Sequence, residues 1–235
     1  MGSQIDPRSG SLDGFLPPSE SKSSSVTEIV SIERDGAAFA RAALERTVLG
    51  GGVAIFPADG VYGLACDPAR ADAIERIHEL KGREDHKPSA VLYFSPLAMR
   101  ELVSALGSRT RDALGALLPG PVTLVVANPE RRYPLACRED PERLGVRLIE
   151  GPLGGASCAL FQTSANRAGD SAPAAFAAIS PELIAAVDLA IDGGELSGTT
   201  STVVDISAIE TGGEERILRQ GTVAADEIRR RLELS

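Results

Sequence analysis

The sequence has few of the side chains on which several common classes of protein chemistry depend. Its 235 residues include no tryptophan, six phenylalanines and three tyrosines. Proteins that bind single-stranded nucleic acid by stacking need aromatic platforms, so this class is disfavoured. Only two histidines, His78 and His86, are present. Catalysis by a histidine acid or base therefore has little material to draw on.

Cysteine is equally scarce. The three cysteines, Cys66, Cys137 and Cys158, are odd in number and widely separated, and they form no C-x-x-C pair. A disulfide framework and a zinc site both need more cysteine or histidine at closer spacing, so we predict no protein metal site. The thiols are expected to behave as small buried hydrophobic groups in a reducing cytosol.

Long apolar runs are missing as well. No stretch of about 18 or more apolar residues could span a bilayer, and the first residues lack the basic and apolar regions of a signal peptide. These features predict a soluble, cytoplasmic protein with no membrane partner. The net charge of −9 argues against a surface that binds nucleic acid by broad counterion release, but it is compatible with a small basic pocket.

The composition predicts one folded domain with a tail. Hydrophobic residues make up 43% of the chain and charged residues 24%, which is an ordinary globular balance and enough for a sizeable core. Residues 1–27 are rich in Ser, Pro and Gly and cannot bury enough apolar area to offset their ordering entropy. We expect 1–27 to be a disordered tail and 28–235 to be the domain.

Apolar periodicity and short apolar runs alternate along the domain. Helices are predicted over 37–48, 70–80, 96–105, 108–118, 173–178, 181–186 and 223–233. Strands are predicted over 53–56, 61–65, 90–94, 122–127, 145–149, 159–162, 188–191, 201–206 and 215–219. Alternation of this kind predicts an α/β fold. Several strand pairs are too close for a helical crossover, so the sheet is expected to be mixed.

The usual nucleotide-binding and hydrolase signatures are absent: no G-x-x-x-x-G-K-[ST], G-x-G-x-x-G, G-x-S-x-G or H-E-x-x-H occurs. Polar loops at strand ends are present instead. Lys81-Gly82-Arg83 and Lys87 place three cations within seven residues. Lysine and arginine suit phosphate binding, although a charge run at a helix end is commonly just a solvated surface.

Hydroxyl and amide groups cluster after two other strands. Thr163-Ser164-Ala165-Asn166 follows an apolar strand, and Gly198–Thr202 precedes another. Such groups can bind ribose, phosphate or carboxylate, but they also form helix caps and Asx-turns. Arg147 lies within a strand and Arg219 precedes Gly221, and both could equally be ordinary ion-pair partners. None of these segments is specific when taken singly.

Taken together and in order, these segments resemble the YrdC/Sua5 family of L-threonylcarbamoyladenylate synthases over about residues 50–221. Pro57–Leu64 is similar to that family's P-T-[DE]-T-V-Y-G-L segment, and Lys81–Arg83 with Lys87-Pro88 to its K-x-R segment. The remaining five matches are to the motifs P-G-P-[LV]-T, V-R, [ST]-S-A-N, S-T-V-[VI]-D and R-x-G, and lie at Leu118–Thr123, Val146-Arg147, Thr163–Asn166, Ser201–Asp205 and Arg219–Gly221.

The resemblance implies a fold and a reaction. The fold is a YrdC-like twisted open mixed sheet with flanking helices around one large basic cavity, here in the short form without the C-terminal Sua5 domain. The reaction converts ATP, L-threonine and bicarbonate into threonylcarbamoyl-AMP and pyrophosphate for the t6A modification of tRNA. Mg²⁺ is expected to accompany ATP, and the product is expected to pass to a tRNA threonylcarbamoyl transfer machinery.

The resemblance also assigns roles to residues. Lys81 and Arg83 are the expected catalytic residues. The expected ATP-binding residues are Arg83, Lys87, Gln162, Ser164, Asn166 and Arg219. The expected threonine-binding positions are Gly60, Leu92, Arg147 and Ser201. A cluster of cations suits this reaction, because carbamate attack on the α-phosphate brings two anions together and needs positioning and charge neutralisation more than proton transfer.

The sequence departs from the family pattern where threonine would bind. The family's two threonines in the first motif are Ala58 and Gly60 here, and Leu92 stands where archaeal members tend to have histidine. Hydroxyl-lined pockets discriminate strongly between ligands, so a paralogue with a different acceptor substrate is an alternative. Carbamoyl-adenylate formation, as in hydrogenase-maturation carbamoyltransferases, is disfavoured because their acylphosphatase and zinc-binding regions are missing.

Two further alternatives come from other classes. A basic concavity could bind double-stranded RNA weakly, by shape and phosphate contacts, although the net charge opposes this. An inactive α/β domain is the other, because a fold does not by itself establish a function. The feature that separates these hypotheses is whether the cationic residues share one closed pocket or spread over an exposed face.

Overall fold

The computed structural model describes residues 26–82 and 88–234. The predicted tail over 1–27 therefore lies outside the described residues except for Val26 and Thr27. Arg83 and Lys87 lie outside them too. Within the described ranges, no helix is long and apolar enough to cross a bilayer.

Eight α-helices and two short 3₁₀ helices form in the described part of the chain. The α-helices are α1 Ile32–Asp35, α2 Ala37–Leu49, α3 Ala71–Lys81, α4 Pro96–Ser104, α5 Ser108–Leu117, α6 Pro134–Cys137, α7 Pro181–Ala185 and α8 Ala225–Glu233. The 3₁₀ helices are η1 Phe176–Ala178 and η2 Ile209–Thr211. Most predicted helices are found within two residues of the expected ends, whereas α1 and α6 were not predicted.

One predicted helix, over 173–178, is wrong in its first half. Its start is held in extended contacts instead: Tyr62 N–H donates to Pro173 O over 2.8 Å, and Leu196 N–H donates to Ala174 O over 2.7 Å. These long-range bonds use carbonyls that a helix would need for its own ladder. Only the 3₁₀ turn η1 remains helical.

The described strands form a single ten-stranded sheet. They are β1 Glu28–Ser31, β2 Ala54–Pro57, β3 Tyr62–Cys66, β4 Ala90–Tyr93, β5 Val122–Ala127, β6 Arg143–Leu148, β7 Leu160–Ser164, β8 Leu189–Asp192, β9 Thr202–Asp205 and β10 Arg216–Arg219. Their order across the sheet is β1-β8-β2-β3-β7-β4-β6-β5-β9-β10. The sheet contains both parallel pairs, such as β4 with β6, and antiparallel pairs, such as β3 with β7, which confirms the predicted mixed sheet.

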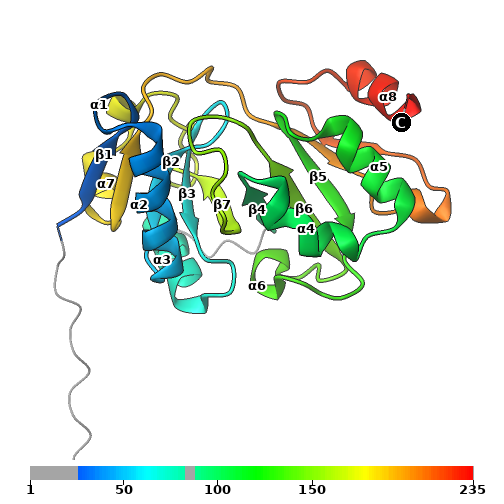
Figure 1. Ribbon diagram of the computed structural model, residues 1–235, viewed down its shortest axis with the longest axis horizontal. Coiled ribbons are helices and arrows are strands. Elements are labelled where there is room, and N and C mark those ends of the chain that lie inside the picture. The colour runs from blue at the N-terminus through cyan, green and yellow to red at the C-terminus, as the bar shows by residue number, and fades with distance from the viewer. Residues whose placement is uncertain (1–25, 83–87, 235) are drawn as a thin grey trace, which may run out of the picture.

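The N-terminal strand β1 was not predicted, because its pairing partner is far away in sequence. It pairs with β8 in parallel, so that Val30 lies opposite Ile191. Only Val30 of this strand is buried, and Ile29 remains half exposed. Figure 1 shows β1 and α2 at one end of the molecule and α8 at the other.

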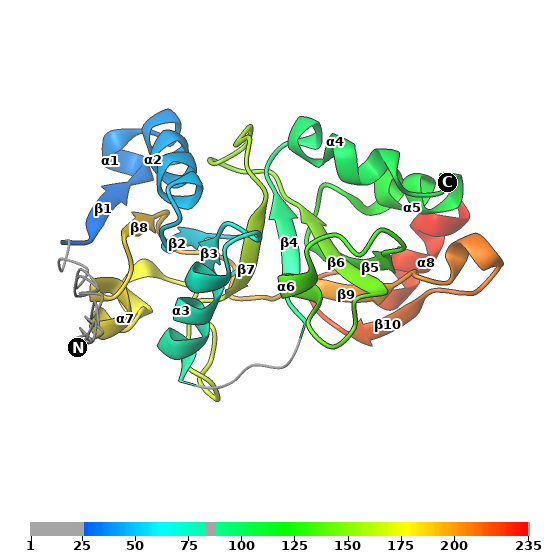
Figure 2. The same cartoon turned by 90° about the horizontal axis from the view of Figure 1, so that it is seen from below.

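The two faces of the sheet carry separate apolar clusters. Helix α2 places Ala40, Ala43, Leu44 and Val48, which follow a helical period, against one face. Helices α3, α4, α5 and α8 pack into the larger cluster on the other face. Figure 2 shows α2 and α3 on opposite sides of β2 and β3.

Helix α2 covers only part of its face of the sheet. The uncovered part carries several of the predicted site residues. Leu92 of β4 lies opposite both Leu160 of β7 and Arg147 of β6, so all three share this face. Leu92 and Leu160 belong to the cluster under α2. Farther along the same strands the residues are small, with Ala90 opposite Gly145. Small side chains leave a hollow there.

We predict that the cluster under α2 carries much of the stability. Leu44→Ala removes a fully buried side chain and should lower the free energy of unfolding by about 2–5 kcal/mol. Leu49→Ala, at the exposed end of the same helix, should change it by less than about 0.5 kcal/mol. Denaturant titrations measure both values. Equal effects of the two substitutions would contradict this packing.

Candidate active site

The hollow on the sheet is a cavity of about 430 Å³ lined by residues from β-strands and the loops between them. Six predicted site positions, separated by up to 159 residues in sequence, line this one cavity: Gly60, Arg147, Gln162, Ser164, Ser201 and Arg219. No residue of a described helix contributes to its wall. The cavity thus collects the ends of several strands around one space.

The topology explains why these distant residues meet. Gly60 lies in the turn between β2 and β3, and β3 pairs with β7 so that Gly63 lies opposite Ser164. Strand β4 lies between β7 and β6, and this brings Arg147 of β6 into the same cavity wall as Ser164 of β7. Ser201 directly precedes β9, and Arg219 ends β10 beside it. Each of these loops opens onto the same face.

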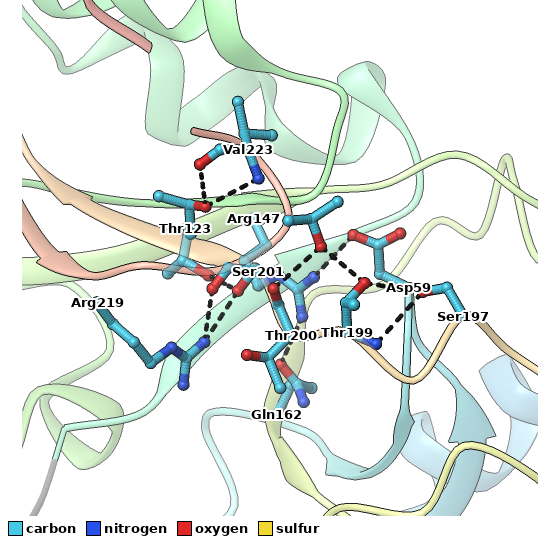
Figure 3. A network of polar contacts seen from close by, with 12 residues as sticks. Asp59, Thr123, Arg147, Gln162, Ser197, Thr199, Thr200, Ser201, Arg219 and Val223 are labelled. Carbon is cyan, nitrogen blue, oxygen red and sulfur yellow. Dashed lines mark hydrogen bonds and ion pairs between the residues drawn. The ribbon is translucent and has the colours of Figure 1, made fainter. Parts of the chain in front are cut away.

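Arg147 is the most deeply buried charged group in the wall, with only 6% of its surface exposed. Its Nη1 donates to Gln162 Oε1 over 3.2 Å, and its Nη2 donates to Asp59 Oδ2 over 3.4 Å (Figure 3). Its Nε is buried and has no hydrogen-bond acceptor in the described chain. The side chain therefore presents a fixed guanidinium with unused hydrogen-bonding capacity.

The environment of Arg147 disfavours its charge. Burial lowers the pKa of Arg147 to about 10, the nearby Asp59 carboxylate opposes this shift, and the positive charge of Arg219 adds to it. A desolvated cation with one weak acidic partner gains from binding an anion, because the anion supplies both charge and hydrogen-bond acceptors. The same end of the cavity is thus suited to a carboxylate or phosphate.

Arg219, at the end of β10, lines the same cavity as Arg147. Its Nη2 donates to Ser201 O over 2.9 Å and to Ser201 Oγ over 3.2 Å, and burial lowers its pKa. Ser201 Oγ is also 2.8 Å from Thr123 Oγ1. Two arginines therefore face a space in which Asp59 is the acidic partner closest to Arg147, so this end of the cavity is electropositive.

Lys81 lies behind the wall and does not line the cavity. It is 3% exposed, and its Nζ donates to Ser164 O over 2.7 Å and to Asn166 O over 2.9 Å. These bonds fix the loop after β7 and so set the position of Ser164. Through these two contacts Lys81 supports the loop that carries Ser164 into the cavity wall, and its expected catalytic role stays a prediction.

Two other predicted positions also lie away from the cavity. Leu92 is fully buried in the cluster under α2. Asn166 lines a separate depression together with Arg167 and Asp170, and its Nδ2 donates to Arg167 O and Asp170 O, each over 2.8 Å. Arg83 and Lys87 are outside the described residues, so the structure does not place them.

The structure adds wall residues that sequence reasoning left unassigned. Asp59, Thr123 and Thr200 lie near the arginines, and Asp140 and Arg143 line the cavity on its other side. Asp59 and Thr123 lie inside two of the sequence motifs, so the motifs could have indicated these two residues as part of the site. Arg143 and Asp140 belong to no motif, and their approach depends on the antiparallel pairing of β5 and β6.

Comparison with known proteins places the chain in a family. The Sua5/YciO/YrdC family model, described as "Telomere recombination", matches residues 46–221. The chain belongs to the Sua5/YciO/YrdC family. This confirms the resemblance inferred from the seven motifs.

Relatives in the Sua5/YciO/YrdC family have named activities. A threonylcarbamoyl-AMP synthase of Nitrosococcus oceani is 40% identical over 130 residues, covering 53% of this chain and 69% of that protein. One from Xanthomonas campestris pv. campestris is 34% identical over 154 residues, covering 63% and 82%.

Solved structures agree with the fold. P. abyssi Sua5 complexed with L-threonine has a TM-score of 0.74 at 25% identity, covering 88% of this chain and 61% of that chain. The chain thus spans about three fifths of that Sua5 protein. E. coli YciO has a TM-score of 0.71 at 20% identity, covering 86% and 98%. The predicted open twisted sheet with flanking helices is confirmed by these likenesses.

Strand β9, which lies in the S-T-V-[VI]-D motif, ends on a buried acid. Asp205 is 2% exposed, and its Oδ2 accepts from Arg216 over 2.6 Å and from Arg143 over 3.1 Å. Burial opposes ionisation of Asp205, but bonds from Ser207 and Arg216 outweigh it and lower its pKa to about 2. Since Arg143 lines the cavity, Asp205 holds part of the cavity rim in place.

We predict that Asp205 makes stability depend on pH in acid. Because its pKa is lowered in the folded state, its contribution is fully present above about pH 4 and is lost as the pH falls towards 2. Asp205→Asn should lower the free energy of unfolding by about 1–2 kcal/mol at pH 7 and flatten this acid slope. Asp226→Asn, at a side chain that is 99% exposed, is the matched control. An unchanged acid slope in Asp205→Asn would contradict the role.

Proposed function

We propose that the protein is a threonylcarbamoyl-AMP synthase, which joins L-threonine, bicarbonate and ATP and releases pyrophosphate. The observation that carries the proposal is the convergence of six predicted ATP- and threonine-binding positions on one electropositive cavity. Relatives with this name and the L-threonine complex of Sua5 support it. The product would supply the t6A modification of tRNA through a separate transfer machinery in the cytoplasm.

The proposed reaction has two bond-forming steps. The threonine amine attacks bicarbonate carbon and water leaves, which gives a carbamate. A carbamate oxygen then attacks the α-phosphorus of ATP, and the bond from that phosphorus to the pyrophosphate oxygen breaks. Both steps bring anions together, so the site must neutralise charge and align the reactants.

The cavity supplies these two needs from its own residues. We assign the threonine carboxylate to Arg147, because its buried guanidinium has open donor positions and sits in a fixed orientation between Gln162 and Asp59. We assign the phosphates to Arg219 and Ser164, which line the same space. Lys81 holds the Ser164 loop through its two carbonyl contacts. The ATP contacts expected of Arg83 and Lys87 stay predictions.

Magnesium would enter this site with its nucleotide. The described residues contain no group of three or more His, Cys, Asp or Glu side chains that could hold a metal ion. Mg²⁺ bound to a triphosphate keeps mainly phosphate and water ligands. It fits the proposal as part of the MgATP substrate, where it would neutralise phosphate charge.

The distribution of cations favours this function over RNA binding. Arg147 is buried and Arg219 is exposed at the end of β10, and both line the same cavity. Recognition of double-stranded RNA needs cations on an open surface that can reach successive phosphates. A paralogue would differ from a threonylcarbamoyl-AMP synthase in its acceptor substrate, and not in the distribution of cations.

The decisive assay measures formation of the AMP adduct from ATP and bicarbonate with each of several amino acids. We expect threonine-dependent threonylcarbamoyl-AMP and an equal amount of pyrophosphate, detected by mass spectrometry. Product with serine or another amine, but none with threonine, would establish the paralogue. Absence of any adduct together with salt-sensitive RNA binding would favour the RNA-binding hypothesis.

Arg147 provides the sharpest mutational prediction for this proposal. Arg147→Gln keeps a polar side chain but removes the charge and the guanidinium fork, and it should lower kcat/KM for threonine by about 100-fold or more. Arg147→Lys should recover only part of this loss, because lysine cannot make the bidentate contact. Steady-state kinetics with threonine as the varied substrate measures both.

The control for Arg147 is Arg109→Gln, which removes an exposed arginine of α5 outside the cavity wall. It should leave kcat/KM within about twofold. If Arg147→Gln instead raised only the KM for ATP, the carboxylate assignment would be wrong.

A further inference from the structure

Gly60 marks a place where two loops touch without room for a side chain. A Cβ atom at position 60 would lie 1.9 Å from Thr199 O and 2.7 Å from Ser197 Oγ. Gly198 N–H also donates to Gly60 O over 2.8 Å. The segment 197–201 therefore occupies the space into which a side chain at position 60 would project, and glycine is required by this close approach.

The segment 197–201 carries four hydroxyl groups, those of Ser197, Thr199, Thr200 and Ser201, and the last three of these residues line the cavity. Three of the four hydroxyl groups are engaged by protein groups. Ser197 Oγ lies 3.0 Å from Thr199 Oγ1, which also accepts from Thr222 Oγ1 over 3.0 Å. Ser201 Oγ contacts Thr123 and Arg219.

The fourth hydroxyl, that of Thr200, has no hydrogen-bond partner among residues 26–82 and 88–234. The Thr200 carbonyl accepts from Thr222 N–H over 3.0 Å and from Thr222 Oγ1 over 3.1 Å, which fixes the backbone. Its side chain points the other way, towards the space between Arg219 and Gln162 (Figure 3), and Thr200 lines the cavity with both of them. An unused hydroxyl on a fixed backbone is a ready contact for a ligand.

The location relates this hydroxyl to the acceptor amino acid. Asp59, the neighbour of Gly60, lies 3.4 Å from Arg147, so the segment that touches Gly60 borders the space beside Arg147. A carboxylate bound to Arg147 places the substituents of its α-carbon within a few ångströms of that wall. Of the other expected threonine-binding positions, Gly60 has no side chain, Leu92 is buried and apolar, and the Ser201 hydroxyl is already engaged by Thr123 and Arg219.

We infer that Thr200 is a specificity-determining residue that hydrogen-bonds the side-chain hydroxyl of the acceptor amino acid. This inference rests on the proposed function and adds the residue that would select an acceptor with a β-hydroxyl group. A polar group left unpaired by the wrong ligand is the strongest source of discrimination available to a binding site. In this chain, a hydroxyl of the segment 197–201 would thus make the substrate contact that a side chain at position 60 cannot make.

The test compares threonine with valine, which has the same shape but no hydroxyl. For the unmodified protein we expect kcat/KM for adduct formation to favour threonine strongly. Thr200→Val, which is isosteric, should reduce the threonine-to-valine ratio of kcat/KM by about 10-fold or more. Thr200→Ser retains a hydroxyl and should keep most of the ratio, which guards against a merely structural effect.

The matched control is Thr211→Val in η2, an exposed threonine whose hydroxyl bonds only Ala208 O and which does not line the cavity. It should leave the ratio unchanged. A full ratio in Thr200→Val would overturn the inference while leaving the proposed function intact. Equal loss for both amino acids would also overturn it, since it would place Thr200 at the nucleotide. If the unmodified protein formed no adduct with any amino acid, the proposed function itself would fail.

Discussion

The structure depends on a charged group that the fold buries without fully pairing. Arg147 sits in a central strand, next to the apolar cluster under α2, and Asp59 and Gln162 are its partners in the described chain. Burying a cation costs free energy unless other groups compensate. The fold retains this cost beside a hollow that small residues keep open. Such a site is stabilised by an anionic ligand, which links the architecture to the chemistry.

The hollow exists because of where side-chain volume is missing. Gly145 and Ala90 lie opposite each other on β6 and β4, and at Gly60 the absence of a side chain lets the segment 197–201 close the cavity from one side. The same face of the sheet is filled by large apolar side chains under α2. Along this face, the large apolar side chains under α2 give way to the small residues beside the cavity.

The sequence predicted most of the fold, because the buried strands are short apolar runs and the helices α2 to α5 have clear apolar faces. It could not predict β1, whose one buried side chain is explained only by the distant β8. For the site, the motifs identified which segments converge but not how each side chain is oriented. Lys81 and Leu92 show this limit: both occur in recognisable segments, yet one supports a loop and the other fills the core.

The proposed function requires one cavity to hold both the amino acid and the nucleotide. A crystal structure with L-threonine and a non-hydrolysable ATP analogue tests it most directly. We expect the threonine carboxylate within about 3 Å of the Arg147 guanidinium and the phosphates beside Arg219. Threonine or nucleotide bound instead in the separate depression beside Asn166 and Arg167, with Arg147 still paired only to Asp59 and Gln162, would contradict it.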